Sequence, residues 1–221
     1  MKKYIAIFSF LSFSMSLIAC QSSEKQENYK LKTISDVQIK KEKLATAYFA
    51  SGCFWCVEAV FESVKGVKEA VSGYSGGEKE NPTYSQISSG SLKHAEAVKV
   101  IYDPTQIDFQ TLVNVFFGSH NPTTFNRQGP DVGPQYRSIA FYQTDEEKLI
   151  IENAIMELTQ KVVYSKKIVT EVIAFDIFWE AEEYHQDYER RNPNVSYVRS
   201  VSVPRLVNFK NKFPELLKDS H

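Results

Sequence analysis

Residues 44–64, LATAYFASGCFWCVEAVFESV, decide the architecture of this chain. The apolar, β-prone run over 44–50 predicts a strand, and Ser51-Gly52 predicts a turn. From residue 54 to residue 64, apolar side chains recur at helical spacing, which predicts a helix. Cys53 therefore stands where a strand turns sharply into a helix, among backbone N–H groups that the helix leaves unpaired.

The pair Cys53 and Cys56 spans one turn of the predicted helix. Unpaired N–H groups and the helix dipole favour a thiolate, so we expect a lowered pKa for Cys53. A Cys-x-x-Cys pair alone is typical of redox sites and of zinc sites alike. A disulfide across so short a loop restrains the unfolded chain little, so redox chemistry explains the pair better than structural stapling.

Strands and helices alternate along the rest of the chain, without an internal repeat. Further strands are expected at 67–74, 95–102, 138–142 and 168–175, and helices at 109–117, 145–162 and 180–191. Asp108 is expected to cap one helix, and Thr144 with Glu147 forms a capping box for the next. The pattern predicts an α+β, two-layer sandwich of helices on a mixed, mostly antiparallel sheet, with a ferredoxin-like core and an irregular C-terminal tail.

The N-terminus differs in composition from the rest of the chain. Lys2 and Lys3 precede an uncharged, apolar run that ends in Leu17-Ile18-Ala19-Cys20, which resembles a bacterial lipoprotein processing box. We expect a signal peptide at 1–19, lipidation of Cys20, a polar linker over 20–43 and one catalytic domain over 44–215. An ordinary secretory signal with a chance cysteine is the alternative. The expected location is the bacterial cell envelope, outside the cytoplasm, and Gln21 favours outer-membrane sorting where that membrane exists.

Beyond Gly52-Cys53-Phe54-Trp55, short motifs follow in a fixed order. They are Gly73-Tyr74, Asn81-Pro82-Thr83-Tyr84, His94-Ala95-Glu96-Ala97-Val98, Tyr102-Asp103-Pro104, His120, Arg127-Gln128-Gly129, Asp131, Gly133, Gln135-Tyr136-Arg137-Ser138, Trp179, Ala181-Glu182 and Tyr184-His185-Gln186. From about Leu44 to Arg190 this series resembles the A-type peptide methionine sulfoxide reductases. That family returns methionine sulfoxide to methionine and acts on one sulfoxide epimer.

The resemblance implies a role for each matching residue. Cys53 would attack the sulfoxide sulfur, Glu96 would protonate the oxygen, and Tyr84 and Tyr136 would hydrogen-bond to it. Without the resemblance, a glutamate on an alternating strand more often points to solvent. Phe54 and Trp55, directly after the nucleophile, are expected to line an apolar pocket for the methyl group, and the alternative is that they are core residues. Asp131 is expected to bind and position the substrate, and His185 to give structural support.

The chain departs from the family pattern at three positions. Ser51 and Lys93 stand where glycine is usual, and Cys56 stands where many members carry glycine. Many members place a resolving cysteine in the C-terminal tail, which has none in this chain. Either Cys56 resolves the Cys53 sulfenic acid, or an external thiol acts on it directly.

The expected partners are oxidised proteins or peptides, a thioredoxin-like reductant and, through the lipid anchor, a membrane. The chain is expected to be a monomer, and no metal, flavin or nucleotide cofactor is implied. A net charge of −1 argues against nucleic-acid binding. His94-x-Glu96 also occurs in zinc deaminases, but there it precedes a Pro-Cys-x-x-Cys motif, which this chain lacks. The alternatives are a general thiol–disulfide oxidoreductase and a lipid-anchored binding module.

Overall fold

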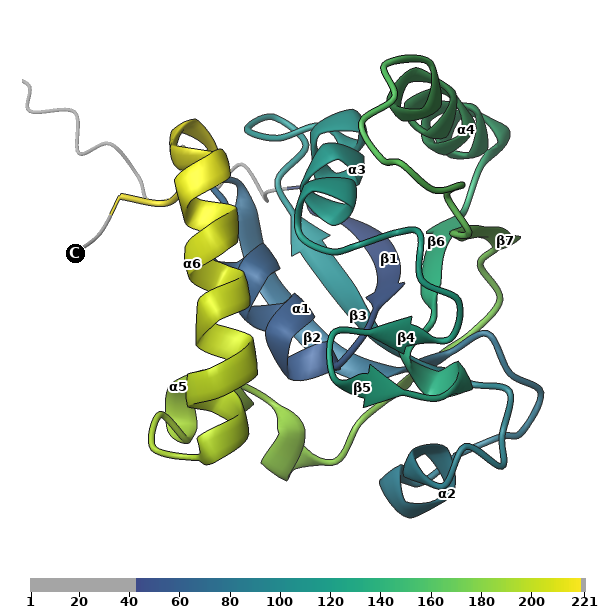
Figure 1. Cartoon of the computed structure of the whole chain (residues 1–221), viewed down its shortest axis with the longest axis vertical. Helices are drawn as coiled ribbons and strands as arrows, with labels where there is room; N and C mark the ends of the chain where they lie inside the picture. Colours follow the sequence, from purple (N-terminus) through teal and green to yellow (C-terminus); the bar gives the residue numbers. More distant parts are fainter. Residues whose placement is uncertain (1–42, 220–221) are drawn as a thin grey trace, which may run out of the picture. The chain divides into compact units, whose positions relative to one another are not determined.

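A six-stranded sheet organises the computed structural model, which describes residues 43–219 (Figure 1). The strands are β1 (Ala45–Ser51), β2 (Val67–Ser75), β3 (Ala95–Tyr102), β6 (Ser138–Tyr142), β7 (Glu171–Ala174) and β8 (Phe178–Glu180). The helices are α1 (Phe54–Glu62), α2 (Tyr84–Ser88), α3 (Phe109–Gly118), α4 (Asp145–Gln160), α5 (Tyr188–Arg191) and α6 (Val203–Lys212). A separate hairpin joins β4 (Arg127–Gln128) to β5 (Asp131–Val132). Strands and helices are thus interleaved along the chain, as expected from the sequence.

The strand order is β7-β6-β1-β3-β2-β8, and only the pairing of β6 with β7 is parallel. β1 lies in the middle, where Phe49 is opposite Val98 of β3 on one side and Ala140 of β6 on the other. In the register of β2 and β3, Tyr74 is opposite Glu96. The predicted mixed, mostly antiparallel sheet is confirmed.

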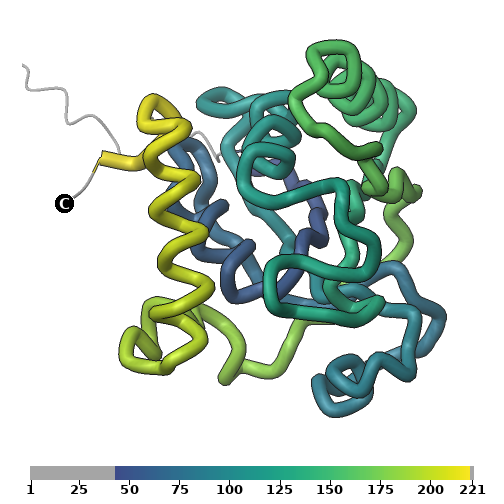
Figure 2. Tube along the Cα trace, viewed as in Figure 1, coloured from purple at the N-terminus to yellow at the C-terminus, as the bar shows by residue number. Residues whose placement is uncertain are grey.

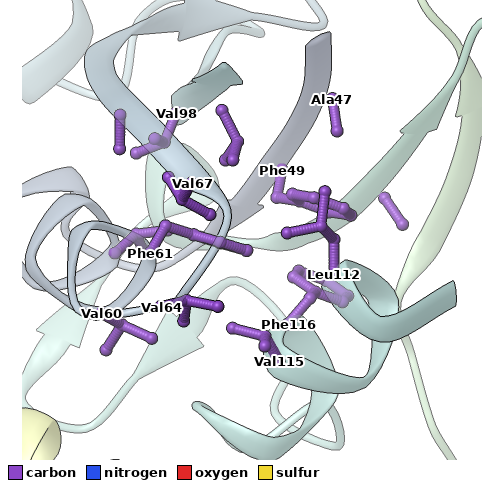
Figure 3. Close-up of a cluster of buried hydrophobic side chains, with 14 of the residues drawn as sticks. Ala47, Phe49, Val60, Phe61, Val64, Val67, Val98, Leu112, Val115 and Phe116 are labelled. Atoms are coloured by element: carbon purple, nitrogen blue, oxygen red, sulfur yellow. The ribbon is translucent and has the colours of Figure 1, made fainter. Parts of the chain in front are cut away.

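The main core lies between one face of the sheet and the helices. Alternation along β1 sends Phe49 to this face, where its ring packs 5.2 Å from that of Phe61 in α1 and 5.1 Å from that of Phe116 in α3 (Figure 3). These rings are fully buried, and each contributes about 2–3 kcal/mol of hydrophobic stabilisation. This packing fixes α1, and with it Cys53, against the sheet.

The opposite face of the sheet carries a smaller cluster. Tyr48 and Ala50 of β1 point to this side, together with Ile139 and Phe141 of β6. The ring of Phe175, just after β7, stacks on Tyr48 with the centroids 3.7 Å apart. The segment between β7 and β8 therefore covers a face that no long helix protects in the described part of the chain.

Two predicted helix starts are present as expected. The carboxylate of Asp108 accepts a 2.7 Å hydrogen bond from the backbone N–H of Thr111 at the start of α3. At the start of α4, the hydroxyl of Thr144 accepts one of 3.2 Å from the backbone N–H of Glu147. The structure adds α2 and the β4–β5 hairpin within segments that the sequence indicates only as loops.

The C-terminal part differs most from expectation. The helix predicted over 180–191 is replaced by the end of β8, a turn with a left-handed residue at Asp187 (φ 54°), and the short α5. The tail was wrongly predicted to be irregular, because α6 forms there. Phe209 of α6 is fully buried, and α6 runs beside α1, so the last helix covers the one that carries the cysteine pair (Figure 2).

The predicted signal peptide (1–19), the lipidation site Cys20 and all of the predicted linker except residue 43 lie outside the described residues. Lys43 is exposed. Within residues 43–219, no helix combines the length and apolar character that a membrane span needs.

Candidate active site

The turn before Cys53 requires glycine. Gly52 has a φ of +94°, and a Cβ atom placed there would lie 2.6 Å from the side chain of Gln128 in β4. The turn makes Cys53 the N-cap residue of α1, and its carbonyl accepts hydrogen bonds from the N–H groups of Cys56 and Val57. Both cysteine side chains are buried and carry free thiols. The predicted strand-turn-helix position of Cys53 is present.

Glu96 lies beside the start of α1, although it belongs to β3. Its Oε2 atom accepts a 3.1 Å hydrogen bond from the backbone N–H of Phe54, the residue after Cys53. The side chain is 1% exposed, and burial raises the pKa of Glu96 to about 8, with smaller contributions from the charges of Asp131 and Cys56. At neutral pH this residue is therefore a carboxylic acid that can donate a proton.

The two expected phenols come from different segments. Tyr84 begins α2, where its backbone N–H donates a 3.0 Å hydrogen bond to Oε1 of Glu182. Tyr136 ends a 3-10 turn at residues 134–136 that packs against β3. Burial raises the pKa of Tyr84 to about 12 and also raises that of Tyr136, and the charge of Glu96 is the next cause for both. Both phenols keep their protons at neutral pH and can donate hydrogen bonds near Glu96.

The thiol pair corrects the expectation of a lowered pKa for Cys53. Burial raises the pKa of Cys53 well above its usual range, and the neighbouring Cys56 and Glu96 raise it further. The lowered pKa belongs to Cys56, at about 6, because Cys53 donates a hydrogen bond to it and the charge of Arg205 is close. The two thiols therefore titrate as a pair, in which Cys56 is the more acidic member.

Asp131 reaches the thiol pair through a residue that the sequence reasoning missed. The hydroxyl of Tyr197 donates a 2.6 Å hydrogen bond to Oδ2 of Asp131 and lies 3.9 Å from Sγ of Cys56. Tyr197 immediately precedes a π-helical turn at 198–202 that leads into α6. Because this segment was predicted to be irregular, nothing marked Tyr197 as part of the site.

From the sequence alone, Arg205 in the charged C-terminal tail is expected to be solvated, and the structure contradicts this expectation. Arg205 projects from α6 and donates hydrogen bonds to the carbonyl oxygen of Ser119 (2.8 Å) and to the hydroxyl of Ser51 (3.1 Å). One signal in the sequence could have identified it, because the apolar Val198 and Phe209 lie three helical turns apart with position 205 on the same face between them. That period places Arg205 on the inner face of a helix.

Aromatic side chains surround the N-terminus of α1. Phe54 is fully buried, and its ring lies 6.4 Å from that of Tyr84, centroid to centroid. Trp55 is half-buried; its Nε1 donates a 3.1 Å hydrogen bond to Nδ1 of His185, and its ring stacks on Tyr188 at 3.7 Å. His185 packs against the rings of Phe54 and Tyr84. Among the described residues it makes no hydrogen bond to Cys53 or Cys56, so its geometry is that of a supporting residue.

One acidic group within residues 43–219 has metal-ligand spacing. Carboxylate oxygens of Glu58, Glu62 and Asp187 come within 4.8 Å of one another. Glu58 already accepts hydrogen bonds from the hydroxyl of Ser72 (2.6 Å) and the backbone N–H of Asp187 (2.7 Å). These contacts explain why a carboxyl can be buried there, and the group contains neither cysteine of the pair.

The site can therefore provide a sulfur nucleophile, a neutral carboxylic acid and two phenol donors. Comparison with known proteins identifies the same chemistry. The family model described as peptide methionine sulfoxide reductase matches residues 45–217. Two curated relatives are a peptide methionine sulfoxide reductase MsrA of Pasteurella multocida (48% identical) and one of Haloquadratum walsbyi (46%), and each alignment covers 78% of this chain and 98% of the relative.

Solved structures give the same answer. The reduced form of Mxr1 from Saccharomyces cerevisiae is 32% identical, with a TM-score of 0.65, over 69% of this chain and 87% of the other. Methionine sulfoxide reductase A of Corynebacterium diphtheriae is 33% identical, with a TM-score of 0.61, over 68% and 76%. The family match spans the strand, the helix and the tail that build the site. This chain belongs to the A-type peptide methionine sulfoxide reductases and is an enzyme that reduces methionine sulfoxide in peptides.

Proposed function

We propose that this enzyme reduces the S-epimer of methionine sulfoxide, in peptides and as the free amino acid, through a sulfenic acid on Cys53. The observation that carries the proposal is the 3.1 Å hydrogen bond from the N–H of Phe54 to Glu96, which holds a neutral carboxyl beside the start of α1. A sulfoxide oxygen leaves sulfur only when it is protonated, and this acid stands next to the nucleophile.

The negative charge reaches Cys53 by a short proton movement. Cys53 donates a hydrogen bond to Cys56, so transfer of that proton to Cys56 leaves Cys53 as the thiolate. The thiolate attacks the sulfoxide sulfur while Glu96 protonates the oxygen, and Tyr84 and Tyr136 hydrogen-bond to it. The oxygen passes to the sulfur of Cys53 and methionine leaves. The substrate sulfur gains two electrons, and Cys53 loses two.

The aromatic residues after Cys53 suit the apolar part of the substrate. The half-buried ring of Trp55, held by His185 and Tyr188, offers surface for the S-methyl group, and the buried Phe54 is proposed to back this apolar site. Asp131, oriented by Tyr197, is assigned to binding and positioning. We infer no direct chemical step for any of these side chains.

Cys56 is proposed to resolve the intermediate. It lies one helical turn from Cys53 and holds the lowered pKa of the pair. Its thiolate displaces hydroxide from the sulfenic acid, a proton completes the water, and a Cys53–Cys56 disulfide remains. A thioredoxin-like donor then restores both thiols by disulfide exchange.

The N-terminal sequence supports a place for this reaction. We propose that residues 1–19 are removed, that Cys20 carries the lipid, and that residues 20–43 tether a monomeric domain of residues 44–215 to a bacterial membrane outside the cytoplasm. Repair of oxidised envelope proteins would be the result. Labelling of cells with a radioactive fatty acid tests the anchor, because Cys20→Ala should abolish incorporation into this chain.

We also infer that β1-α1-β2-β3-α3-β6 forms a ferredoxin-like core. The order β6-β1-β3-β2, with every neighbouring pair antiparallel and a helix after β1 and after β3, supports this. The remaining strands and helices are additions around it.

One experiment separates the proposed reaction from general thiol–disulfide exchange. The purified chain is given peptides carrying the S- or the R-epimer of methionine sulfoxide and, separately, insulin as a disulfide substrate. We expect methionine from the S-epimer alone, its loss in Cys53→Ser, and a Cys53–Cys56 disulfide by mass spectrometry. Efficient insulin reduction without methionine formation would instead support a dithiol oxidoreductase.

A further inference from the structure

The side chain of Arg205 connects the C-terminal helix to the turn that carries Cys53. Its Nε donates a 2.8 Å hydrogen bond to the carbonyl oxygen of Ser119, and its Nη2 donates one of 3.1 Å to the hydroxyl of Ser51. Ser51 is 1% exposed and Ser119 is 6% exposed, so both acceptors are buried. The guanidinium is therefore fixed by two partners rather than free to sample solvent.

The third nitrogen of Arg205 lies against the backbone just before Cys53. A Cβ atom placed on Gly52 would be 3.5 Å from Nη1, and within residues 43–219 Nη1 has no hydrogen-bond partner of its own. The guanidinium of Arg205 forms no ion pair among the described residues, and its charge also acts to lower the pKa values of the neighbouring Asp131 and His120. The charge is thus available to the buried thiol pair beside this turn.

We propose that Arg205, held in place by Ser51, is a positioning residue that keeps Cys56 ionised while Cys56 resolves the Cys53 sulfenic acid. This inference rests on the proposed function, in which Cys56 is the resolving cysteine. It also assigns a role to Ser51, because the hydroxyl of Ser51 accepts the hydrogen bond that Nη2 of Arg205 donates.

The groups that face Cys56 explain why this charge matters most after the first half of the reaction. The hydrogen bond from Cys53 is the largest cause of the lowered pKa of Cys56, followed among the favourable causes by Arg205 and then by Ser202 and Tyr197. Oxidation of Cys53 to a sulfenic acid removes that thiol. Of the causes that remain, Arg205 is the leading favourable one, burial is the leading unfavourable one, and the neighbouring Glu96 opposes a charge on Cys56 when it is itself ionised.

The resolving step balances with groups already present. The Cys56 thiolate attacks the sulfur of the Cys53 sulfenic acid, an S–S bond forms and the S–O bond breaks. Cys56 gives up the proton that it received from Cys53, the carboxylate that the first half leaves on Glu96 can carry it, and the departing oxygen takes this proton and leaves as water. Cys56 is oxidised from thiolate to disulfide, and the sulfur of Cys53 is reduced from sulfenic acid to disulfide.

The test measures the two half-reactions separately. Reduced full-length protein is mixed with one equivalent of a methionine-S-sulfoxide peptide over about pH 5 to pH 9, a range that brackets the lowered and the ordinary thiol pKa. Acid-quenched samples give the rate of methionine formation by chromatography and the rate of disulfide formation by alkylation and mass spectrometry. The variants are Arg205→Met, Arg205→Lys and Ser51→Ala, with the exposed Arg199→Met as a matched control.

For Arg205→Met we expect the pH midpoint of disulfide formation to rise by about one unit, which makes this step about fivefold slower at the parent midpoint and about tenfold slower well below it. The rate should approach that of the parent chain at alkaline pH, where Cys56 ionises without help. Ser51→Ala should shift the midpoint in the same direction by less, Arg205→Lys should restore most of it, and Arg199→Met should leave it unchanged.

Two outcomes would overturn the inference. An unchanged midpoint in Arg205→Met would show that the charge does not act on Cys56, and a loss of equal size at every pH would indicate a purely structural role. Failure of the proposed function gives a different result, because the parent chain would then form methionine without any Cys53–Cys56 disulfide.

Discussion

The backbone N–H of Phe54 donates a hydrogen bond to the carboxyl of Glu96, 42 positions further along the chain, at 3.1 Å. The donor is at the N-terminus of α1, directly after the nucleophile Cys53, and the acceptor is on β3, one of the two central strands of the sheet. The bond therefore sets the position of the proton donor relative to the sulfur. It also uses an N–H group that a helix start leaves unpaired, which helps to satisfy a carboxyl in a buried place.

Glu96→Gln should slow methionine formation about 100-fold to 10,000-fold at neutral pH, the usual size of a general-acid contribution. The amide keeps the size of the side chain but has no acidic proton to give to the oxygen. Quenched single-turnover assays with the S-sulfoxide peptide measure the rate of methionine formation directly. The exposed Glu69→Gln on β2 is the control and should react at the parent rate. A Glu96→Gln rate equal to that of the parent would remove Glu96 from the acid role.

The rate of methionine formation should fall as the pH rises through about 8. In this range Glu96, whose pKa burial raises to about 8, loses the proton that it donates. The Cys53–Cys56 pair gains its shared charge at lower pH, since the pKa of Cys56 is about 6. A bell-shaped single-turnover profile is expected, and in Glu96→Gln the descending limb should disappear. A profile that keeps rising beyond pH 8 in the parent chain would contradict this assignment.

The same carboxyl should make folding stability depend on pH. Because the pKa of Glu96 is about 8 in the folded chain, against 4.5 for an ordinary glutamate, its stabilising contribution is complete below 4.5 and is lost as the pH rises through about 8. The limiting slope for one proton is about 1.4 kcal/mol per pH unit. Burial also raises the pKa of Glu58 to about 7, which acts in the same direction.

Comparison of variants isolates the part due to Glu96. Urea unfolding of the parent chain and of Glu96→Gln at several pH values gives the free energy of unfolding of each. The variant should gain stability relative to the parent as the pH rises from about 5 to about 8, because its amide stays neutral. A constant difference across this range would mean that Glu96 does not hold its proton in the folded state.

Cys56→Ser should form one methionine per enzyme and then stop when thioredoxin is the only reductant. Without the second thiol, the sulfenic acid on Cys53 persists and becomes accessible to a sulfenic-acid-specific label, which mass spectrometry detects. A small external thiol should restore turnover because it can attack the sulfenic acid itself. Sustained thioredoxin-driven turnover by Cys56→Ser would show instead that the external donor resolves the intermediate.

Gly73→Ala should destabilise the domain by about 2–3 kcal/mol, a typical cost of overpacking. A Cβ atom on Gly73 would lie 2.3 Å from the ring of Phe178 and 2.4 Å from the carbonyl oxygen of Trp179. The second neighbour is backbone, so relief requires separation of β2 from β8. Gly129→Ala is the contrast, since nothing lies within 4 Å there and only its left-handed φ opposes a side chain. Chemical denaturation of both variants tests the difference, and equal losses would contradict it.

Local patterns in the sequence were enough to predict much of the fold. The apolar run over 44–50 corresponds to β1, and the helical spacing after the glycine turn corresponds to α1. Both could be predicted because each element repeats its apolar side chains with a single period. Asp108 and Thr144 cap their helices as expected, since a cap acts within a few residues of itself. The position of Cys53 follows from the same short-range rules, as does its separation from Cys56.

Tertiary structure alone decided how the site is charged and which residues complete it. Spacing cannot show that burial raises the pKa of Cys53 and leaves the lowered value on Cys56, because burial depends on every element packed around the pair. Tyr197 and Arg205 join the site only because α6 packs on α1, more than 100 residues away in sequence. The sequence of an amphipathic helix shows which of its faces is apolar but not which surface that face packs against. Contacts between distant segments could therefore be known only from the tertiary structure.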